Sequence, residues 1–248
     1  MHPAETVARV HALFSSGRTT RDIAREVGLP EATVGHWRRG DRRSGPGGGS
    51  CPRCTAGTLP DSYAYLLGSY LGDGYITGHR RGVHSLSVYC SDDYPGVMGE
   101  VAAALSEVFG TGVCHVPRAG CTEVKSYSKH WTCLFPQHGP GRKHTRPIVL
   151  APWQQDVVDE HTGPFLRGLF HSDGCRMTNW TTRRVAGEVK RYTYPRYFFS
   201  NESADIMGLC QGALDRLGVA WRMPKPNTLS VARREAVAAL DVHVGPKS

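Results

Sequence analysis

The sequence lacks any apolar run of the ~20 residues that a membrane-spanning helix requires, and no apolar signal segment follows its first residues. These two absences argue against a membrane partner and predict an intracellular protein, cytoplasmic or nucleoid-associated. A disulfide scaffold is not expected either. In that compartment, the eight cysteines of this chain should be reduced thiols or metal ligands.

Acidic side chains are also in short supply. The 248 residues include 22 Asp and Glu against 30 Lys and Arg, which gives a formal net charge of +8. This balance favours an acidic partner, with nucleic acid first and an anionic membrane surface second. The basic residues are spread over the whole chain, however, so solubility alone would explain them equally well.

The most informative feature present is a repeat of one apolar segment. Leu66-Leu67-Gly68-Ser69-Tyr70-Leu71-Gly72-Asp73-Gly74 corresponds to Leu166-Arg167-Gly168-Leu169-Phe170-His171-Ser172-Asp173-Gly174. Each copy has a glycine five residues before its aspartate, and the two aspartates are 100 residues apart. A repeat of this period predicts two copies of one structural unit.

The glycines and the aspartates of the repeat have a joint physical meaning. A glycine inside an apolar helix lets a partner helix approach backbone to backbone, so Asp73 and Asp173 would emerge side by side. Two carboxylates at helix C-termini repel each other and the helix dipoles, and divalent cations would relieve this. If only one copy of the segment were present, an Asp-Gly turn that caps a core helix would be a sufficient explanation of its aspartate.

The two segments resemble the LAGLIDADG motif of homing endonucleases in their single-chain, two-motif form, over about Ser62 to Pro246. The resemblance implies an α+β fold of two pseudo-symmetric αββαββα halves, 61–160 and 161–248. Each half would lay a curved antiparallel sheet into the major groove of double-stranded DNA. A chain that contains its own pseudo-twofold is expected to be a monomer.

The resemblance also implies a site-specific, metal-dependent DNA endonuclease. Asp73 and Asp173 would hold catalytic Mg²⁺ (or Mn²⁺), one aspartate for each DNA strand, with the backbone carbonyls of Gly72 and Ser172 as further ligands. The metals would activate a water molecule and stabilise the leaving oxygen. The resemblance therefore implies that the chain is a phosphodiester hydrolase.

Family members usually place a lysine near each scissile phosphate. The expected positions read Cys90-Ser91-Asp92 and Ser200-Asn201-Glu202, without lysine. Side chains that could substitute are basic and close in sequence to the strands concerned: Arg176, Lys125, Lys129, His130 and Arg233.

The missing lysines leave a second function open, a sequence-specific transcriptional regulator that binds DNA without cutting it. A splicing maturase that acts on RNA is a third reading. Signs of intein splicing are missing, because the chain starts with Met1 and ends Pro246-Lys247-Ser248, so we expect a free-standing protein.

Residues 1–41 are predicted to form three short helices. Apolar residues recur at helical spacing, Gly17 ends the first helix, Thr19 or Thr20 can cap the second, and Gly28 opens the turn before the third. This pattern resembles a helix-turn-helix of the invertase, resolvase and transposase kind. The third helix would then offer four side chains to a major groove: Thr33, His36, Arg38 and Arg39. A three-helix bundle that binds protein, or nothing, is the alternative.

Residues 42–60 read as a linker rich in glycine and arginine. Farther along, the strands of both halves alternate polar and aromatic residues, as expected of a sheet face that reads base edges and phosphates. A solvated face would look similar. The candidates for DNA contact on these strands are Tyr127, His130, Trp131, Arg183, Arg184 and Arg196. The loop 139–144 is basic and could contact phosphate as well.

Cys51-Pro52-Arg53-Cys54 has the spacing of half a zinc site, but the sequence contains no second CxxC. Two of the three residues Cys133, His138 and His144 could complete a tetrahedral structural Zn²⁺ site if the fold brings the segments together. Two reduced cysteines in a tight turn are the simpler reading.

Overall fold

The computed structural model describes residues 4–38, 51–55, 57–245 and 247–248, in two compact units that span 1–48 and 49–248. Arg39 and most of the predicted linker lie outside the described residues. No helix within the described part of the chain combines the length and the apolar content that crossing a membrane requires.

The first unit consists of α1 (Ala4–Ser15), α2 (Thr20–Val27) and α3 (Glu31–Arg38). Thr19 caps α2, since its side-chain oxygen accepts a hydrogen bond from the Asp22 backbone at 3.2 Å. Gly28 ends α2 in the left-handed conformation, with φ 66°. The helices share a small apolar core made of Val7, Val10, Ile23, Ala24, Val34 and Trp37.

The second unit repeats one order of elements twice, as the αββαββα prediction requires. The first half comprises α4 (Ser62–Asp73), β1 (Gly74–Gly78), β2 (His84–Ser91), α5 (Pro95–Phe109), β3 (Val113–Arg118), β4 (Cys121–Ser128), α6 (Trp131–Leu134) and α7 (Pro152–Glu160). The second half comprises α8 (Thr162–Asp173), β5 (Gly174–Val185), β6 (Glu188–Ser200), α9 (Ala204–Arg216), β7 (Arg222–Lys225), β8 (Thr228–Val231) and α10 (Arg234–His243). Two 3₁₀ turns complete the first half, η1 (Arg80–Gly82) and η2 (Lys143–Thr145).

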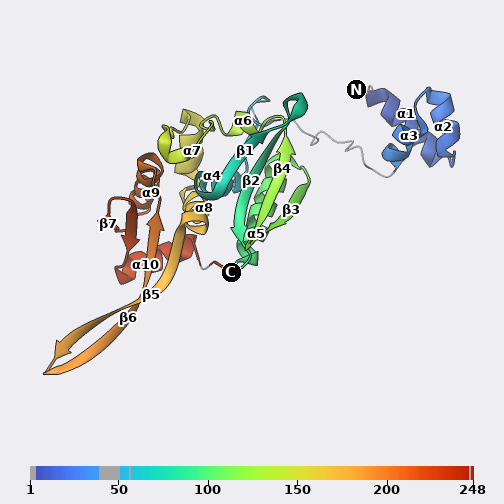
Figure 1. Ribbon diagram of the computed structural model, residues 1–248. Helices are drawn as coiled ribbons and strands as arrows, with labels where there is room; N and C mark the ends of the chain where they lie inside the picture. The colour runs from blue at the N-terminus through green and yellow to red at the C-terminus, as the bar shows by residue number, and fades with distance from the viewer. Residues whose placement is uncertain (1–3, 39–50, 56, 246) are drawn as a thin grey trace. The chain divides into compact units, whose positions relative to one another are not determined.

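Each half folds one four-stranded antiparallel sheet, with strand orders β1-β2-β4-β3 and β5-β6-β8-β7. The two orders are equivalent, which confirms the predicted pseudo-symmetry of an α+β fold. Figure 1 shows α4 and α8 next to each other at the centre, with one sheet on either side. In the first sheet, Leu86, Val88 and Val124 point inward and are buried, while the alternate residues face away from the helices.

Glycine permits the contact between α4 and α8. A Cβ atom on Gly68 would clash with the Phe165 carbonyl and lie 2.8 Å from the Leu169 nitrogen. A Cβ atom on Gly168 would clash with the Tyr65 carbonyl in the same way. Both glycines are buried, so the two helix backbones touch at these positions, as the sequence predicts.

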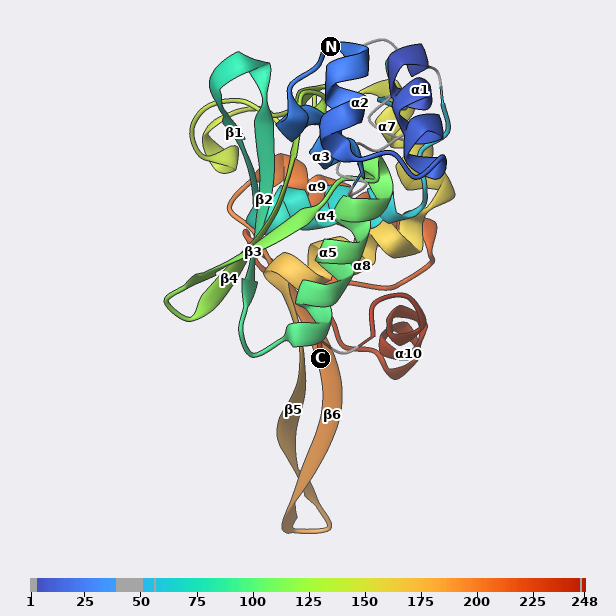
Figure 2. The same ribbon diagram turned by 90° about the vertical axis from the view of Figure 1, so that its right-hand side faces the viewer.

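Strand lengths differ between the two halves. The β5–β6 hairpin pairs as far as Val185 with Glu188, and Figures 1 and 2 show it projecting from the second sheet.

Strand β4 ends at Ser128, and Trp131, expected on a strand, begins α6 instead. The Trp131 side chain is fully buried and its indole donates to the Ser126 carbonyl at 3.0 Å. The prediction that Trp131 contacts DNA is therefore wrong.

Replacing Gly68 with alanine tests the central contact. We expect Gly68→Ala to destabilise the folded state by about 3 kcal/mol or more, because the added methyl group meets rigid backbone of α8. Gly208→Ala is the matched control, since Gly208 is exposed in α9 with no atom within 4 Å of its Cβ position. That control should stabilise by up to about 1 kcal/mol. Urea unfolding monitored by circular dichroism measures both, and equal stability of the two variants would contradict a glycine-dependent contact.

Candidate active site

The two repeated helices end at a common point. Both Asp73 and Asp173 are last residues of their helices, and a Cβ atom on Gly72 would lie 3.0 Å from an Asp173 carboxylate oxygen. The glycine after each aspartate is required locally. A Cβ atom on Gly74 would lie 2.5 Å from the Tyr70 Cα atom, because the chain turns back there into β1. Gly174 is equivalent in the second half.

Two clefts flank this point, and each combines residues of both halves. One cleft is lined by Asp73 together with Ser172, Lys247 and Cys90. Each of these has a counterpart in the other cleft, which is lined by Asp173, Gly72, Lys143 and Asn201. Each cleft therefore pairs the aspartate of one half with the residue that precedes the aspartate of the other.

The lysines missing from the strands are present in these clefts. The Lys143 ammonium donates to the Gly72 carbonyl at 2.7 Å, and the Lys247 ammonium donates to the Ser172 carbonyl at 3.2 Å. The sequence analysis missed both as active-site residues, although it singled out the loop around Lys143 as basic. A signal was available, since Lys143 follows Asp73 by 70 residues and Lys247 follows Asp173 by 74.

The charges of the site influence one another strongly. Although the Asp73 side chain reaches solvent, the surrounding protein and the Asp173 carboxylate raise the pKa of Asp73 to about 6, against the opposing effect of both lysines. Burial also raises the pKa of Asp173, opposed by a 2.6 Å hydrogen bond from the Asn201 amide. Burial lowers the pKa of Lys143 to about 8 despite the two carboxylates, and that of Lys247 moves in the same direction.

The donor set suits a hard divalent cation. Two carboxylates and two backbone carbonyls converge, and the pKa of Asp73, raised by its surroundings and by Asp173, indicates that the negative charge is incompletely balanced. Oxygen ligands of this kind are those that Mg²⁺ prefers. The two lysine ammonium groups already supply positive charge next to the same carbonyl oxygens.

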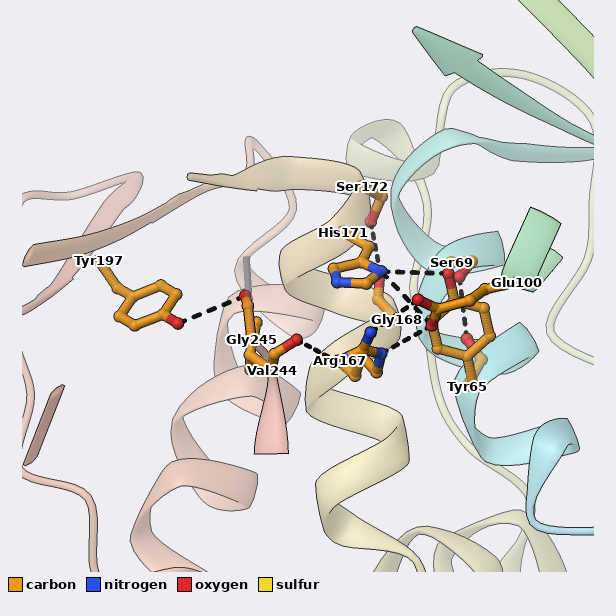
Figure 3. A network of polar contacts seen from close by, with 10 residues as sticks. All are labelled: Tyr65, Ser69, Glu100, Arg167, Gly168, His171, Ser172, Tyr197, Val244 and Gly245. Atoms are coloured by element: carbon orange, nitrogen blue, oxygen red, sulfur yellow. Dashed lines mark hydrogen bonds and ion pairs between the residues drawn. The ribbon is translucent and has the colours of Figure 1, made fainter. Parts of the chain in front are cut away.

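A polar network holds α8 and the segment that carries Lys247 in place (Figure 3). Arg167 donates to both carboxylate oxygens of Glu100 on α5, at 2.7 and 2.6 Å, and to the Val244 carbonyl beyond α10. The buried imidazole of His171 lies 3.2 Å from the Tyr65 hydroxyl, and burial lowers its pKa to about 4. His171 is therefore neutral near pH 7 and does not join the charges of the site.

The C-terminal residues are anchored next to this network. The Ser248 carbonyl accepts backbone hydrogen bonds from Gly96 and Val97, at 2.6 and 3.2 Å, in the first turn of α5. The Lys247 ammonium lies 5.6 Å from the centre of the Tyr94 ring. These contacts fix the direction in which Lys247 enters its cleft.

The basic residues first considered as substitutes for the lysines have other partners. Arg176 forms a two-point ion pair with Asp241, at 2.8 and 3.0 Å. Lys125 lies 3.3 Å from Glu123 on the face of the first sheet that points away from the helices. Lys129 is exposed in the turn between β4 and α6. None of the three lines either cleft.

Candidate DNA-contacting residues are distributed over the outward sheet faces. Tyr127 is 42% exposed on the first sheet. In the second sheet, Arg183 and Arg196 line one groove with Arg222 and Arg233. Arg184 lies on the opposite face of the β5–β6 hairpin from Arg183, as the period-two geometry of a strand dictates.

The cysteine residues singled out in the sequence meet with a different histidine. Cys51, Cys54 and Cys133 come together with His130, and their ligand atoms all lie within 4.8 Å of one another. His138, by contrast, pairs with the Tyr70 hydroxyl at 2.9 Å, and His144 is exposed in η2. The assignment of His138 and His144 to this cluster is therefore wrong, and His130 lies in it and not on a DNA-reading strand.

In the first unit, the predicted recognition helix is present as α3. His36 and Arg38 are exposed, while Thr33 is partly buried. The Arg38 guanidinium donates to Thr20 at 3.4 Å and lies 5.6 Å from the centre of the Phe14 ring, so Arg38 also holds the helices together. A role of these residues in DNA binding remains a prediction.

Solved structures similar to this chain are LAGLIDADG proteins. The LAGLIDADG meganuclease I-AabMI, bound to uncleaved DNA, shares 9% identity over 73% of this chain and 83% of that chain, with a TM-score of 0.46. The N-terminal LAGLIDADG domain of DUF199/WhiA shares 12% identity over 76% and 82%, with a TM-score of 0.44. The homing endonuclease I-WcaI, bound to its DNA recognition sequence, shares 13% identity over 77% and 83%, with a TM-score of 0.42.

No protein-family model and no curated protein sequence matches the chain. The likeness to the solved structures concerns the fold alone. The function proposed below therefore rests on the residues of this chain.

The raised pKa of Asp73 predicts that its carboxylate destabilises the metal-free protein. The folded pKa of about 6 exceeds the ordinary value of 3.8, so the penalty is complete above pH 6 and vanishes below about pH 4, where both states are protonated. We expect Asp73→Asn to raise Tm by roughly 2–4 °C at pH 8, a range that allows for solvent screening, and to leave it unchanged near pH 4.

Calorimetry in the presence of a chelator measures this difference across the pH range. Asp156→Asn is the control, because Asp156 is exposed on α7, away from both clefts. A lower Tm for Asp73→Asn at pH 8 would mean that attraction to the lysines outweighs burial and repulsion.

Proposed function

We propose that this protein is a metal-dependent endonuclease that cuts double-stranded DNA at a specific site, one strand in each cleft. The supporting observation is the duplicated arrangement of an aspartate from one half, a backbone carbonyl from the other half and a lysine. Two equivalent clefts related by the internal repeat suit a substrate whose two strands are themselves related by a twofold axis.

Asp73 and Asp173 would hold Mg²⁺ together with the carbonyls of Gly72 and Ser172. When bound, the metal supplies an activated water molecule and stabilises the leaving oxygen of the phosphodiester. The hydrogen bond from Asn201 fixes the orientation of the Asp173 carboxylate. In the other cleft Cys90 holds the equivalent position on β2, and its shorter side chain carries a thiol in place of the amide.

The lysines contribute in two ways. Their charge compensates the negative charge that develops on the phosphate, in a partly enclosed site where such compensation is strongest. In addition, the pKa of Lys143, lowered by burial to about 8, is close to the operating pH, so its ammonium can donate a proton to the leaving oxygen. Binding of DNA and metal must draw the two ammonium groups away from the carbonyl oxygens on which they rest.

The outward sheet faces would bind the DNA. The groove of the second sheet contains four arginines and the aromatic rings of Tyr192, Tyr194 and Trp221. Guanidinium groups bind phosphate and guanine edges, and aromatic residues supply apolar contact to bases. The long β5–β6 hairpin extends this surface, and the first unit would add contacts through α3.

A regulator that binds DNA without cutting is the second candidate. One observation favours it: the two ammonium groups already occupy the carbonyl oxygens that a metal would need, at 2.7 and 3.2 Å. In that case the lysines would replace the cation permanently, and the paired aspartates would have no catalytic role.

Incubation with a complex DNA library and Mg²⁺ separates the two functions. Recurrent new ends at one long motif, absent with the Asp73→Asn/Asp173→Asn variant, are expected of the endonuclease. Both proteins should enrich the same sequences in a binding assay, because the aspartates lie away from the arginine groove. Enrichment of a motif that is never cut would reject the endonuclease and support the regulator.

If each cleft cuts one DNA strand, each lysine should affect only one of the two cuts. Lys143→Met should slow cutting of one strand by about 100-fold and Lys247→Met that of the other, so that each variant accumulates DNA nicked in a different strand. Strand-specific end labels on the target measure both rates. Lys129→Met is the control, because Lys129 lies outside both clefts. Equal loss on both strands in each variant would show that the two clefts do not work separately.

A further inference from the structure

Residues 51–55 lie against α6, remote in sequence, and bring together three cysteines and one histidine. The sulfur atoms of Cys54 and Cys133 lie 4.0 Å apart. The His130 Nδ1 atom lies 3.6 Å from the Cys54 sulfur and 3.7 Å from the Cys133 sulfur. Cys51 is the fourth member, and its side chain is almost completely buried.

These separations agree with those of a metal-centred tetrahedron. With Zn–S near 2.3 Å and Zn–N near 2.05 Å, tetrahedral geometry places ligand sulfurs about 3.8 Å apart and sulfur and nitrogen about 3.6 Å apart. A disulfide requires sulfurs about 2 Å apart. All eight cysteines are free thiols in the structure, so the cluster has the spacing of a metal site and not that of a cross-link.

Both pairs of ligands are positioned by the protein itself. Cys51 and Cys54 lie in one tight turn, closed by two hydrogen bonds of 3.0 Å from Thr55 to the Cys51 carbonyl. His130 and Cys133 lie one turn apart at the start of α6, where the Cys133 backbone nitrogen donates to the His130 carbonyl at 3.0 Å. A site whose ligands are held before the metal binds loses little entropy on binding it.

Contacts outside the cluster hold the two segments in position. The guanidinium of Arg53, inside the turn, lies 4.5 Å from the centre of the Trp153 ring on α7. Helix α6 is fixed by Trp131 and Leu134, which are fully buried in the core of the second unit. The cluster therefore joins residues 51–55 to the first half at a defined place.

We propose that Cys51, Cys54, His130 and Cys133 bind one structural Zn²⁺ ion. The three cysteines bind as thiolates and release their protons to solvent, and the neutral imidazole of His130 binds through Nδ1. Four protein ligands leave no open position, which is the pattern of a structural and not a catalytic zinc. The ion fastens residues 51–55 to the first half of the second unit, independently of the Mg²⁺ chemistry proposed for the aspartates.

Metal analysis of the full-length protein tests the site. Protein purified with zinc in the medium should contain one Zn²⁺ per chain, and Cys54→Ser should lose it. Cys114→Ser is the matched control, since Cys114 is also exposed but lies on β3, outside the cluster. Zinc content near zero in the wild-type protein, or equal zinc in both variants, would overturn the proposal.

Cobalt substitution supplies a measurement that does not depend on a variant folding. Addition of Co²⁺ to reduced, metal-free wild-type protein should produce the thiolate charge-transfer band and the intense visible bands of a tetrahedral Co²⁺ site, and one equivalent of Zn²⁺ should remove them. The weak spectrum of octahedral cobalt would contradict the site. Loss of DNA cleavage does not enter either test, so a failure here is distinguishable from a failure of the proposed nuclease.

Discussion

The approach of two helix backbones at Gly68 and Gly168 is the constraint on which the rest of the second unit depends. Because neither glycine can carry a side chain, α4 and α8 pack more closely than helices with larger residues at the contact. Their ends, and the strands that follow, are then determined in space. The aspartates meet because they terminate helices that already touch, and the two sheets diverge from the same point.

This geometry creates an electrostatic cost that residues from distant parts of the chain offset. Two carboxylates at adjoining helix C-termini are disfavoured by each other and by the helix dipoles. Lys143 and Lys247 approach them from the ends of the two halves, and each donates to the backbone carbonyl that precedes an aspartate. The two ammonium groups therefore balance part of the negative charge of the site. Under the proposed function, a divalent cation would compensate the carboxylates and the ammonium groups would face the phosphate of the substrate.

Features that depend on local order could be predicted from the sequence, and those that depend on distant contacts could not. The repeat around Gly68 and Gly168 fixes the central helices, and period-two alternation identifies most strands, because both reflect neighbouring residues. Lys143 was not recognised as an active-site residue, since nothing local distinguishes it within a basic loop. The proposed zinc ligand His130 was assigned to a strand for a related reason: β4 ends before it, because the Trp131 side chain is buried in the core.

The two halves share a topology but have diverged in their periphery. In the second half the β5–β6 hairpin extends as an exposed ribbon whose two faces carry Arg183 and Arg184. The first half has a shorter β1–β2 pair, and α6, which carries Cys133 of the cysteine cluster, packs against β2. Divergence of this kind leaves the side chains of the two halves most alike at the clefts, where, under the proposed function, the two strands of one substrate would require equivalent chemistry. On the sheets the divergence removes the twofold relation, so the two ends of a bound DNA target would contact different side chains. A target recognised by such a protein should be asymmetric in sequence even though it is cut by a nearly symmetric site.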